Sequence, residues 1–418
     1  MKTMTIFIAF LVMLSPLNAQ SLTLHECITK ALSTHPDIKK FILQVEQSRY
    51  AKDAIKADNR PQISLNAEYD PTHTFTMTQN GAFDTTQASG WQGGVNINQK
   101  IWDFSKTSFA IKAAQKSENI AALSLKDARA LLVYYVKLQY EQIRVQKEAI
   151  LVREQDMKSK KELYEQAKAL LKQGIKTKAD TTRFLSAFYN AKDNLSIAHA
   201  NLEKARIALA TLIGEPIKKD VTLDAMIYKN TKEIMHLNNA SMLEHNPQLQ
   251  EIKETIDKNK YLYQEAKASR YGSIDASLSY SHQDILYRYN NSIVGISFKI
   301  PLYSGGRTAA VIQQAKISQE ISKRAYQSKK LALQQELAQL LTDFKRYNTT
   351  IASKKVQLEA SIQTKQLIEA RYKEGLSTYI EVLDAISLYL NAKLGLIEAH
   401  YEQHNIINRI EYLQGKTL

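Results

Sequence analysis

The chain has almost no cysteine, since Cys27 is the only one in 418 residues. This excludes an intramolecular disulfide and a cysteine-ligated metal cluster, and we expect Cys27 to be a small, half-buried residue of the first helix. Proline and glycine are also scarce, with 7 and 13 residues, so turns should be few and regular segments long. Beyond residue 19, no stretch reaches the roughly 20 apolar residues that a membrane-spanning helix needs. If the mature chain enters a membrane, it must do so with strands.

The N-terminus has the pattern of an export signal. Lys2, an apolar run over 6–14 and the triplet at 17–19 predict a signal peptide at 1–19. The alternative, a membrane-spanning anchor, needs a longer run than this. The net charge of +14 could indicate nucleic acid. However, lysine and arginine are interspersed with glutamate and glutamine, as on solvated helix faces, so we expect no nucleic acid partner.

The sequence contains two copies of one unit. Residues 101–107 match 302–308 at a spacing of 201 residues, and Gly174 matches Gly375 at the same spacing. Upstream the spacing is 211, so we expect a longer loop in the first copy, around 71–90. After the signal peptide, the sequence predicts a first repeat at 20–214, a connector of short elements at 215–239 and a second repeat at 240–418. Each repeat should contain a helix, two strands, a long helix and a return helix.

Long helices dominate both copies. Between 103 and 213 there is no proline, and Gly174 is the only glycine; good helix formers predominate. We predict a helix over about 105–171, which at 1.5 Å per residue is roughly 100 Å long. Gly174 should end it with a left-handed turn, followed by a return helix to about 212. In the second copy the turn falls at Gly375 and the return helix runs to Leu413.

The long helices carry apolar residues at every seventh position. This period indicates packing against neighbouring helices. An ordinary coiled coil would show the same period, so the stripe alone does not exclude one. The stripe comprises Val136, Ile143, Ile150, Met157, Tyr164 and Leu171, and in the second copy Leu337, Phe344, Ile351 and Leu358, with Lys365 interrupting it before Tyr372.

Two segments of alternating polarity precede each long helix, at 62–69 and 91–101 and again at 274–280 and 296–302. Alternation over about ten residues with aromatic ends is typical of outer-membrane barrel strands. Trp91 and Trp102 are accordingly predicted to lie at the membrane interfaces. A soluble half-buried sheet is the alternative. Four strands cannot close a barrel, and an open edge in lipid leaves backbone groups unpaired. Three chains would give twelve strands and a lumen, and the polar inner faces favour this homotrimer over a dimer.

Residues 371–385 (RYKEGLSTYIEVLDA), continued by 390–393, resemble the TolC-like outer membrane efflux proteins, as do 22–36 and 300–307. The resemblance implies a mainly α fold with a small β-barrel part. Long α-helical hairpins would form a periplasmic tunnel, and four strands per chain would contribute to a trimeric 12-stranded transmembrane β-barrel. The chain would lie in the outer membrane of a Gram-negative bacterium, in contact with its lipid and with a long periplasmic portion.

The same resemblance implies a function without a cofactor. The chain would be the passive exit duct of a tripartite efflux or type I secretion system. Its partners would be a periplasmic adaptor (membrane fusion) protein and an inner-membrane pump or ABC transporter. Two alternatives stay open: the same duct serving protein secretion rather than small-molecule efflux, and a periplasmic coiled-coil scaffold without a pore.

The resemblance also places a gate at the two hairpin turns. The adaptor-contacting tips would be Gly174 with Ile175 and Gly375 with Leu376. Glu381 and Asp384 match acidic residues of the pore constriction. Their spacing of three puts both carboxylates on one helix face, and three chains would form a ring that favours cations. A solvated helix face is the alternative.

Three further residues match positions that link neighbouring tips in the closed gate. They are Asp180, Tyr372 and Ser377. At Ser377 some family members have an arginine, so a different polar contact should replace that salt bridge here. The first copy lacks the acidic pair, because Asp180 and Arg183 occupy the matching positions.

The sequence offers little for other chemistry. His400 and His404 are four residues apart, but no third metal ligand is evident. Gly305 and Gly306 are not followed by the lysine and serine of a phosphate-binding loop. We therefore expect neither a metal site nor enzymatic activity.

Overall fold

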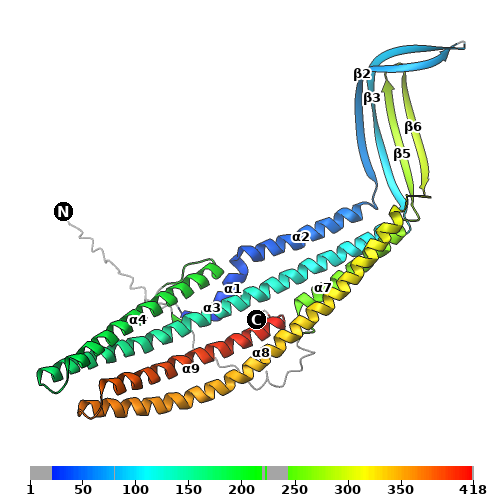
Figure 1. Ribbon diagram of the computed structural model, residues 1–418. Helices are drawn as coiled ribbons and strands as arrows, with labels where there is room; N and C mark the ends of the chain where they lie inside the picture. The colour runs from blue at the N-terminus through cyan, green and yellow to red at the C-terminus, as the bar shows by residue number, and fades with distance from the viewer. Residues whose placement is uncertain (1–20, 80, 219–221, 224–242, 417–418) are drawn as a thin grey trace, which may run out of the picture. The chain divides into compact units, whose positions relative to one another are not determined.

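The computed structural model describes residues 21–79, 81–218, 222–223 and 243–416 (Figure 1). The predicted signal peptide and most of the predicted connector lie outside the described residues. The chain divides into two compact units. Unit 1 combines the described parts of Met1–His35, Leu132–Met235 and Asp343–Arg409, and unit 2 combines those of Pro36–Leu131, His236–Thr342 and Ile410–Leu418. The repeat boundaries at 214 and 239 remain a sequence-based prediction.

Two long helices contribute to both units, α3 (Lys106–Lys172) and α8 (Arg307–Lys373). The return helices are α4 (Lys178–Ile213) and α9 (Tyr379–Leu413). These bounds agree with the predicted helices to within one or two residues, because glycine ends each long helix. The seventh-residue stripe is largely buried, with Val136, Ile143 and Phe344 at most 2% exposed. Within the described ranges, no helix is both long and apolar enough to cross a membrane.

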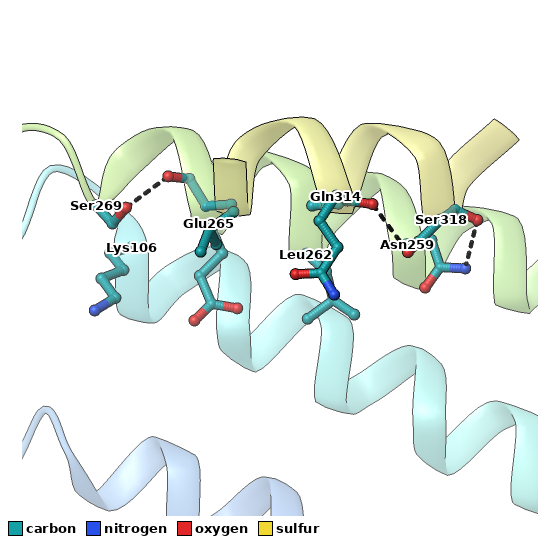
Figure 2. A pocket seen from close by; sticks show the side chains of 10 residues that line it. Lys106, Asn259, Leu262, Glu265, Ser269, Gln314 and Ser318 are labelled. Atoms are coloured by element: carbon teal, nitrogen blue, oxygen red, sulfur yellow. Dashed lines mark hydrogen bonds between the residues drawn. The ribbon is translucent and has the colours of Figure 1, made fainter. Parts of the chain in front are cut away.

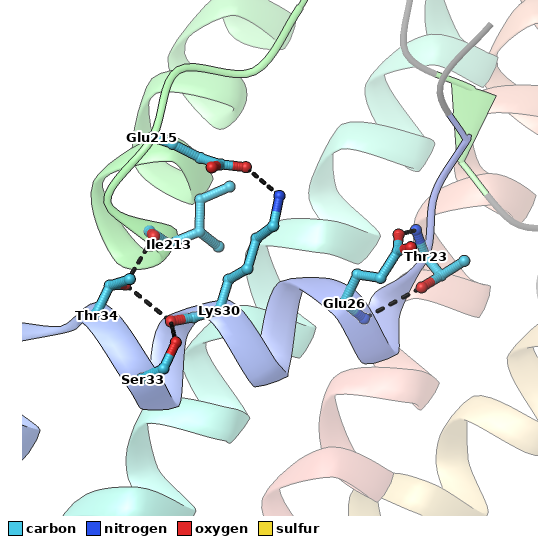
Figure 3. A network of polar contacts seen from close by, with 7 residues as sticks. All are labelled: Thr23, Glu26, Lys30, Ser33, Thr34, Ile213 and Glu215. Atoms are coloured by element: carbon cyan, nitrogen blue, oxygen red, sulfur yellow. Dashed lines mark hydrogen bonds and ion pairs between the residues drawn. The ribbon is translucent and has the colours of Figure 1, made fainter. Parts of the chain in front are cut away.

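In unit 1, α1 (Leu24–Thr34) packs against α4, and its last residue contacts the C-terminal end of that helix. Thr23 and Glu26 form a capping box that starts α1 (Figure 3). At the other end of α1, Lys30 pairs with Glu215, and the Thr34 hydroxyl donates to the Ile213 carbonyl at 2.9 Å. A short parallel pair, β1 (Ser21–Leu22) with β4 (Thr222–Leu223), lies at the start of this segment.

Cys27 is fully buried in α1, so the expectation of a half-buried residue was wrong. The packing of α1 against α4 leaves the thiol without solvent. Burial raises the pKa of the Cys27 thiol to about 12. The thiol therefore stays protonated and unreactive at neutral pH.

Unit 2 contains α2 (Pro36–Ala57), α7 (Pro247–Ala268) and one antiparallel sheet. The sheet has four strands in the order β2 (Gln62–Gln79), β3 (Ala82–Trp102), β5 (Ser273–Asp284) and β6 (Arg288–Lys299) (Figure 1). Among the described residues, β2 and β6 form the edges of the sheet and do not pair with each other. The predicted fold class, mainly α with a small barrel-forming sheet, is confirmed.

The sheet has one apolar and one polar face. Register pairs Ile63 with Ile97 and Leu65 with Val95, and Val95 in turn with Tyr280, so apolar side chains of adjacent strands share a face. Ile97 is half-buried and the other four side chains are exposed, with Leu65 at 80%. The most exposed members of this face are Ile63, Leu65, Trp91, Val294, Ile296 and Phe298. An exposed apolar face of this extent marks a surface that contacts a membrane or another protein.

The predicted loop around 71–90 is wrong, because β2 and β3 continue pairing to Gln79 and Ala82. The ten extra residues of the first copy therefore lengthen a hairpin. Pro71 lies where the register shifts between Asp70 and His73, and a proline is tolerated at such an irregularity and on an edge strand. The last predicted strand, at 296–302, was placed too far along the chain, since β6 begins at Arg288 and ends at Lys299.

The two junctions between sheet and long helix differ in composition. Phe104 and Ser105 have φ values of 55° and 68°, and the matching Gly305 and Gly306 have 59° and 84°. A left-handed φ is unfavourable for residues with a side chain. The Phe104 ring packs 5.4 Å from that of Tyr271, and this contact helps to hold the first junction in place.

Candidate functional site

The two hairpin turns have the same backbone construction. In the first, Gly174 has φ 74° and the Ile175 N–H donates to the Leu170 carbonyl at 3.0 Å. In the second, Gly375 has φ 78° and the Leu376 N–H donates to the Arg371 carbonyl at 2.8 Å. These are Schellman turns, which require a left-handed residue and therefore favour glycine. The side chains that follow, Ile175 and Leu376, are 57% and 68% exposed.

Both return helices begin with a capping box. The Thr177 N–H donates to Asp180 Oδ2 at 2.8 Å, and the Asp180 N–H donates back to Thr177 Oγ1 at 3.3 Å. In the second hairpin the Thr378 N–H donates to Glu381 Oε2 at 2.7 Å, and the Glu381 N–H donates to Thr378 Oγ1 at 3.3 Å. These exchanges satisfy backbone donors at each helix start and fix two of the predicted site residues, Asp180 and Glu381.

Behind the turns, side chains from four helices form one buried cluster, which we call the tip cluster. It belongs to unit 1 and joins the two hairpins of one chain. The rings of Phe184 and Tyr372 meet edge to face, with centroids 5.6 Å apart and planes at 71°, a favourable geometry for an aromatic pair. The buried members are Leu163 and Ala167 of α3, Phe184 of α4, Tyr372 of α8, and Val382 and Ile386 of α9.

The predicted constriction residues lie at the start of α9. Glu381 and Asp384 are both exposed there, and the residues between and beside them, Val382 and Ala385, are buried. The structure therefore places the two carboxylates on the exposed face of the helix. The hydrogen bond from the Thr378 backbone N–H holds the pKa of Glu381 below its usual value, so this carboxylate is ionised at neutral pH. The ring formed by three chains remains a prediction.

Of the predicted gate-link residues, Tyr372 belongs to the tip cluster, whereas Asp180 and Ser377 are buried outside it. Tyr372 is fully buried, and Asp180 and Ser377 are 8% and 5% exposed. Burial and, secondarily, the charge of Asp180 raise the pKa of Tyr372 to about 12. The hydroxyl groups of Tyr372 and Ser377 have no hydrogen-bond partner among the described residues. Buried hydroxyl groups without a partner destabilise the packing that encloses them.

Sequence analysis missed one residue of this site, Lys176. Its Nζ donates to the Ser377 carbonyl at 3.2 Å and lies 4.6 Å from the centroid of the Tyr372 ring. The only sequence signal is positional, because Lys176 and Ser377 are 201 residues apart and so occupy the same place in the two copies. The capping roles of Asp180 and Glu381 were also missed, although a threonine three residues before each acidic residue predicts them.

The predicted interface aromatics lie near the ends of the apolar sheet face. Trp91 is 63% exposed and packs 4.8 Å from Tyr69, and Trp102 is 52% exposed and packs 6.2 Å from Phe104. Trp91 pairs with Asp284 at one end of β5, and Trp102 with Ile274 at the other.

No group of three or more histidine, cysteine or acidic side chains is placed to hold a metal ion in the part of the chain that the structure describes. His400 and His404 are not part of such a group, and the Nδ1 atom of His404 lies 3.9 Å from Oε1 of Glu141. A groove of about 410 Å³ in unit 2 is lined mainly by α7 and α8 (Figure 2). Its lining includes Lys106, Leu262, Glu265 and Gln314. Burial raises the pKa of Glu265; the charge of Lys106 lowers this pKa by a smaller amount, and the charge of Asp103 raises it slightly.

We predict that Glu265→Gln stabilises the protein at neutral pH and not in acid. The pKa of Glu265 is higher in the folded chain than in the unfolded one, so its contribution to folding is most favourable below the unfolded pKa. That contribution is lost as pH rises through the folded pKa. The gain at pH 7 should be below about 1 kcal/mol, since the site is only half buried. Thermal unfolding by circular dichroism at pH 7 and near pH 4 measures it.

Glu320→Gln is the matched control, because the pKa of the exposed Glu320 is lowered by its hydrogen bond from Lys323. That variant should show no gain at pH 7. An equal gain for Glu265→Gln at both pH values would contradict the assignment of burial as the cause.

A model of the family described as outer membrane efflux protein matches residues 27–215 and 240–416. The chain belongs to this family. As a member of the outer membrane efflux proteins it is an outer-membrane transport protein of a Gram-negative bacterium, with a long periplasmic portion. The family consists of export channels rather than enzymes.

Individual family members resemble the chain over most of its length. The cation efflux system protein CusC of Escherichia coli is 23% identical, covering 93% of this chain and 85% of its own. The alkaline protease secretion protein AprF of Pseudomonas aeruginosa is 22% identical, covering 98% and 88%. The solved structure of the Campylobacter jejuni CmeC outer membrane channel superposes with a TM-score of 0.83 at 15% identity, covering 94% and 85%. The fold is therefore shared, although few residues are.

Proposed function

We propose that three copies of the chain close one twelve-stranded barrel in the outer membrane and form a passive, gated exit duct. The observation that carries this proposal is the four-stranded sheet of unit 2, which has an exposed apolar face and two edges that no other described strand pairs with. In lipid every backbone group needs a partner, so β2 of one copy would pair with β6 of the next. The apolar face would then contact lipid, and the polar face, which includes Asn66, Asn96 and Lys299, would line a lumen.

The duct receives its cargo from an inner-membrane pump or ABC transporter through a periplasmic adaptor protein. The two tips are suited to bind the adaptor, since each presents an exposed apolar residue, Ile175 or Leu376, immediately after a rigid turn. We propose small-molecule efflux as the function. The similarity to a cation efflux protein supports it, and the similarity to a protease secretion protein keeps protein secretion as the second candidate.

Ion conductance of the purified protein in a planar lipid bilayer tests the duct. We expect discrete channels, and chemical cross-linking should give trimers. A periplasmic scaffold without a pore would give neither channels nor insertion. Deleting the gene and measuring susceptibility to toxic cations and dyes, beside secretion of exported proteins, separates the two cargo classes.

We predict that Glu381→Ala combined with Asp384→Ala weakens the cation preference of the channel. Six carboxylates around one axis would concentrate cations at the constriction, and both side chains are exposed on α9 in each chain. Block by divalent cations should weaken by about tenfold or more, because a tenfold change in affinity corresponds to only one lost interaction of moderate strength. Reversal potentials in a salt gradient measure the preference.

Glu398→Ala is the control, since Glu398 is an exposed acidic residue on the same helix but far along the chain from the turn. It should leave selectivity and block unchanged. If the double variant also retained both, the acidic ring would be wrong while the duct could stand.

A further inference from the structure

We propose that a cavity between α3, α8 and α9 binds a small organic ammonium ion that has an apolar part. The cavity has a volume of about 300 Å³ and lies within unit 1. Its described lining comes from a single copy of the chain. The proposal therefore goes beyond the duct and does not depend on it.

The cavity is lined by a buried carboxylate group that has one unpaired oxygen. Asp156 of α3 is 6% exposed and belongs to the lining. Its Oδ2 accepts a hydrogen bond from Lys160 Nζ at 3.0 Å, whereas Oδ1 is buried without a hydrogen-bond partner among the described residues. A buried acceptor without a partner destabilises the fold, and the penalty is larger for a charged group. A ligand that donates a hydrogen bond to Oδ1 would remove this penalty.

The cavity has room for an organic molecule as well as apolar walls to contact it. A water molecule occupies about 30 Å³ in the liquid. The volume of about 300 Å³ lies at the lower end of the range for small-molecule pockets. Ile386 and Leu390 of α9 line the same cavity and are 1% and 8% exposed. These features fit a molecule with a charged donor at one end and an apolar group at the other.

The other charged groups indicate where the ammonium group would bind. Lys365 Nζ pairs with Glu369 Oε1 at 3.1 Å and lies 5.4 Å from the centroid of the Tyr389 ring. Lys393 Nζ lies 5.5 Å from the same centroid and donates to the Tyr389 hydroxyl at 3.0 Å. Two cations already flank this ring, so a third cation would be repelled there. The ammonium group is therefore assigned to Oδ1 of Asp156.

A metal ion fits this cavity less well than an organic cation. No group of three or more histidine, cysteine or acidic side chains is placed to hold a metal ion within the described ranges. The other acidic residue that α3 contributes, Glu162, is exposed and lies one helical turn from Lys158. A single buried carboxylate oxygen suits a cation that carries its own hydrogen-bond donors.

Binding of 2-phenylethylamine to the full-length purified protein tests the proposal. The amine is a cation at pH 7, and its ring can pack against Ile386 and Leu390. Isothermal titration calorimetry should show that it binds about tenfold more tightly than 2-phenylethanol, which has the same apolar part without the charge. Asp156→Asn should weaken binding of the amine by about tenfold or more, because a hydrogen bond to a charged group is lost. Asp193→Asn changes an exposed aspartate of α4 and should bind the amine like the wild type.

Four results would overturn the proposal. The wild type might not bind the amine, or might bind the alcohol equally well. Asp156→Asn might bind the amine like Asp193→Asn. Binding might instead be lost when Glu381→Ala is combined with Asp384→Ala, which would place the ligand at the tip carboxylates.

An unchanged helical signal in circular dichroism verifies that Asp156→Asn is folded. Should it misfold, the comparison of amine with alcohol in the wild type and the tip double variant decide the matter. Because none of these measurements depends on conductance, the cavity and the duct can fail separately.

Discussion

Leu65→Arg should prevent the chain from assembling in the outer membrane. Leu65 is 80% exposed on the apolar face of the sheet, where it lies beside Val95. An arginine on the lipid face of a barrel costs about 2–4 kcal/mol near the bilayer midplane, and a trimer would carry three of them. We expect the amount of heat-stable trimer in outer-membrane fractions to fall by about tenfold or more, since each 1.4 kcal/mol is a factor of ten.

Ser64→Arg is the matched control for this prediction. Ser64 is the neighbouring residue of β2 and points to the opposite, polar face, so an arginine there would meet water in the lumen. Semi-native gels and immunoblots of both variants give the comparison. Equal loss in the two variants would show that the apolar face does not contact lipid, and equal tolerance would favour a soluble sheet.

Phe184→Ala should open the gate and destabilise the tips. Phe184 is fully buried in the tip cluster, where it contacts the rings of Tyr372 and Tyr379. Replacing a buried phenylalanine by alanine lowers the free energy of unfolding by about 3–5 kcal/mol, because apolar burial is lost and a cavity remains. The hairpins lose the apolar contact that joins them, so purified channels should conduct at a high level without an adaptor. The helical signal should also decay at a lower temperature.

Tyr189→Ala serves as the control on the same helix, since Tyr189 is 58% exposed. It removes an aromatic ring of similar size without creating a buried cavity, and it should leave conductance and thermal unfolding nearly unchanged. The role of the tip cluster would be refuted by a Phe184→Ala channel that closes normally despite its lower stability.

The long helices and their ends were predictable because local signals determine them. Gly174 and Gly375 supply the left-handed residue of each turn, and the buried stripe that includes Val136 and Phe344 repeats at a fixed period. The strands were predictable only where polarity alternates. Between 71 and 90 the ten extra residues of the first copy suggested a longer loop, but they instead extend the hairpin, with an irregularity at Asp70–His73.

The site was predictable in part, and the missing part depends on tertiary packing. The family resemblance pointed to Tyr372, Ser377 and Asp180, which the structure buries, Tyr372 within the tip cluster and the other two outside it. Lys176 could not be found in this way, because its role arises from contact between turns 201 residues apart. Its own hairpin contains several lysines, and only the fold distinguishes the one that reaches across.

The two sheet-to-helix junctions give the ends of α3 and α8 different freedom. Glycine at 305 and 306 has access to conformations on both sides of φ zero, whereas Phe104 and Ser105 are confined to the one in which packing holds them. Bending of α8 against the sheet therefore meets little local resistance, and bending of α3 meets much more. The backbone can therefore rotate more freely where β6 leads into α8 than where β3 leads into α3.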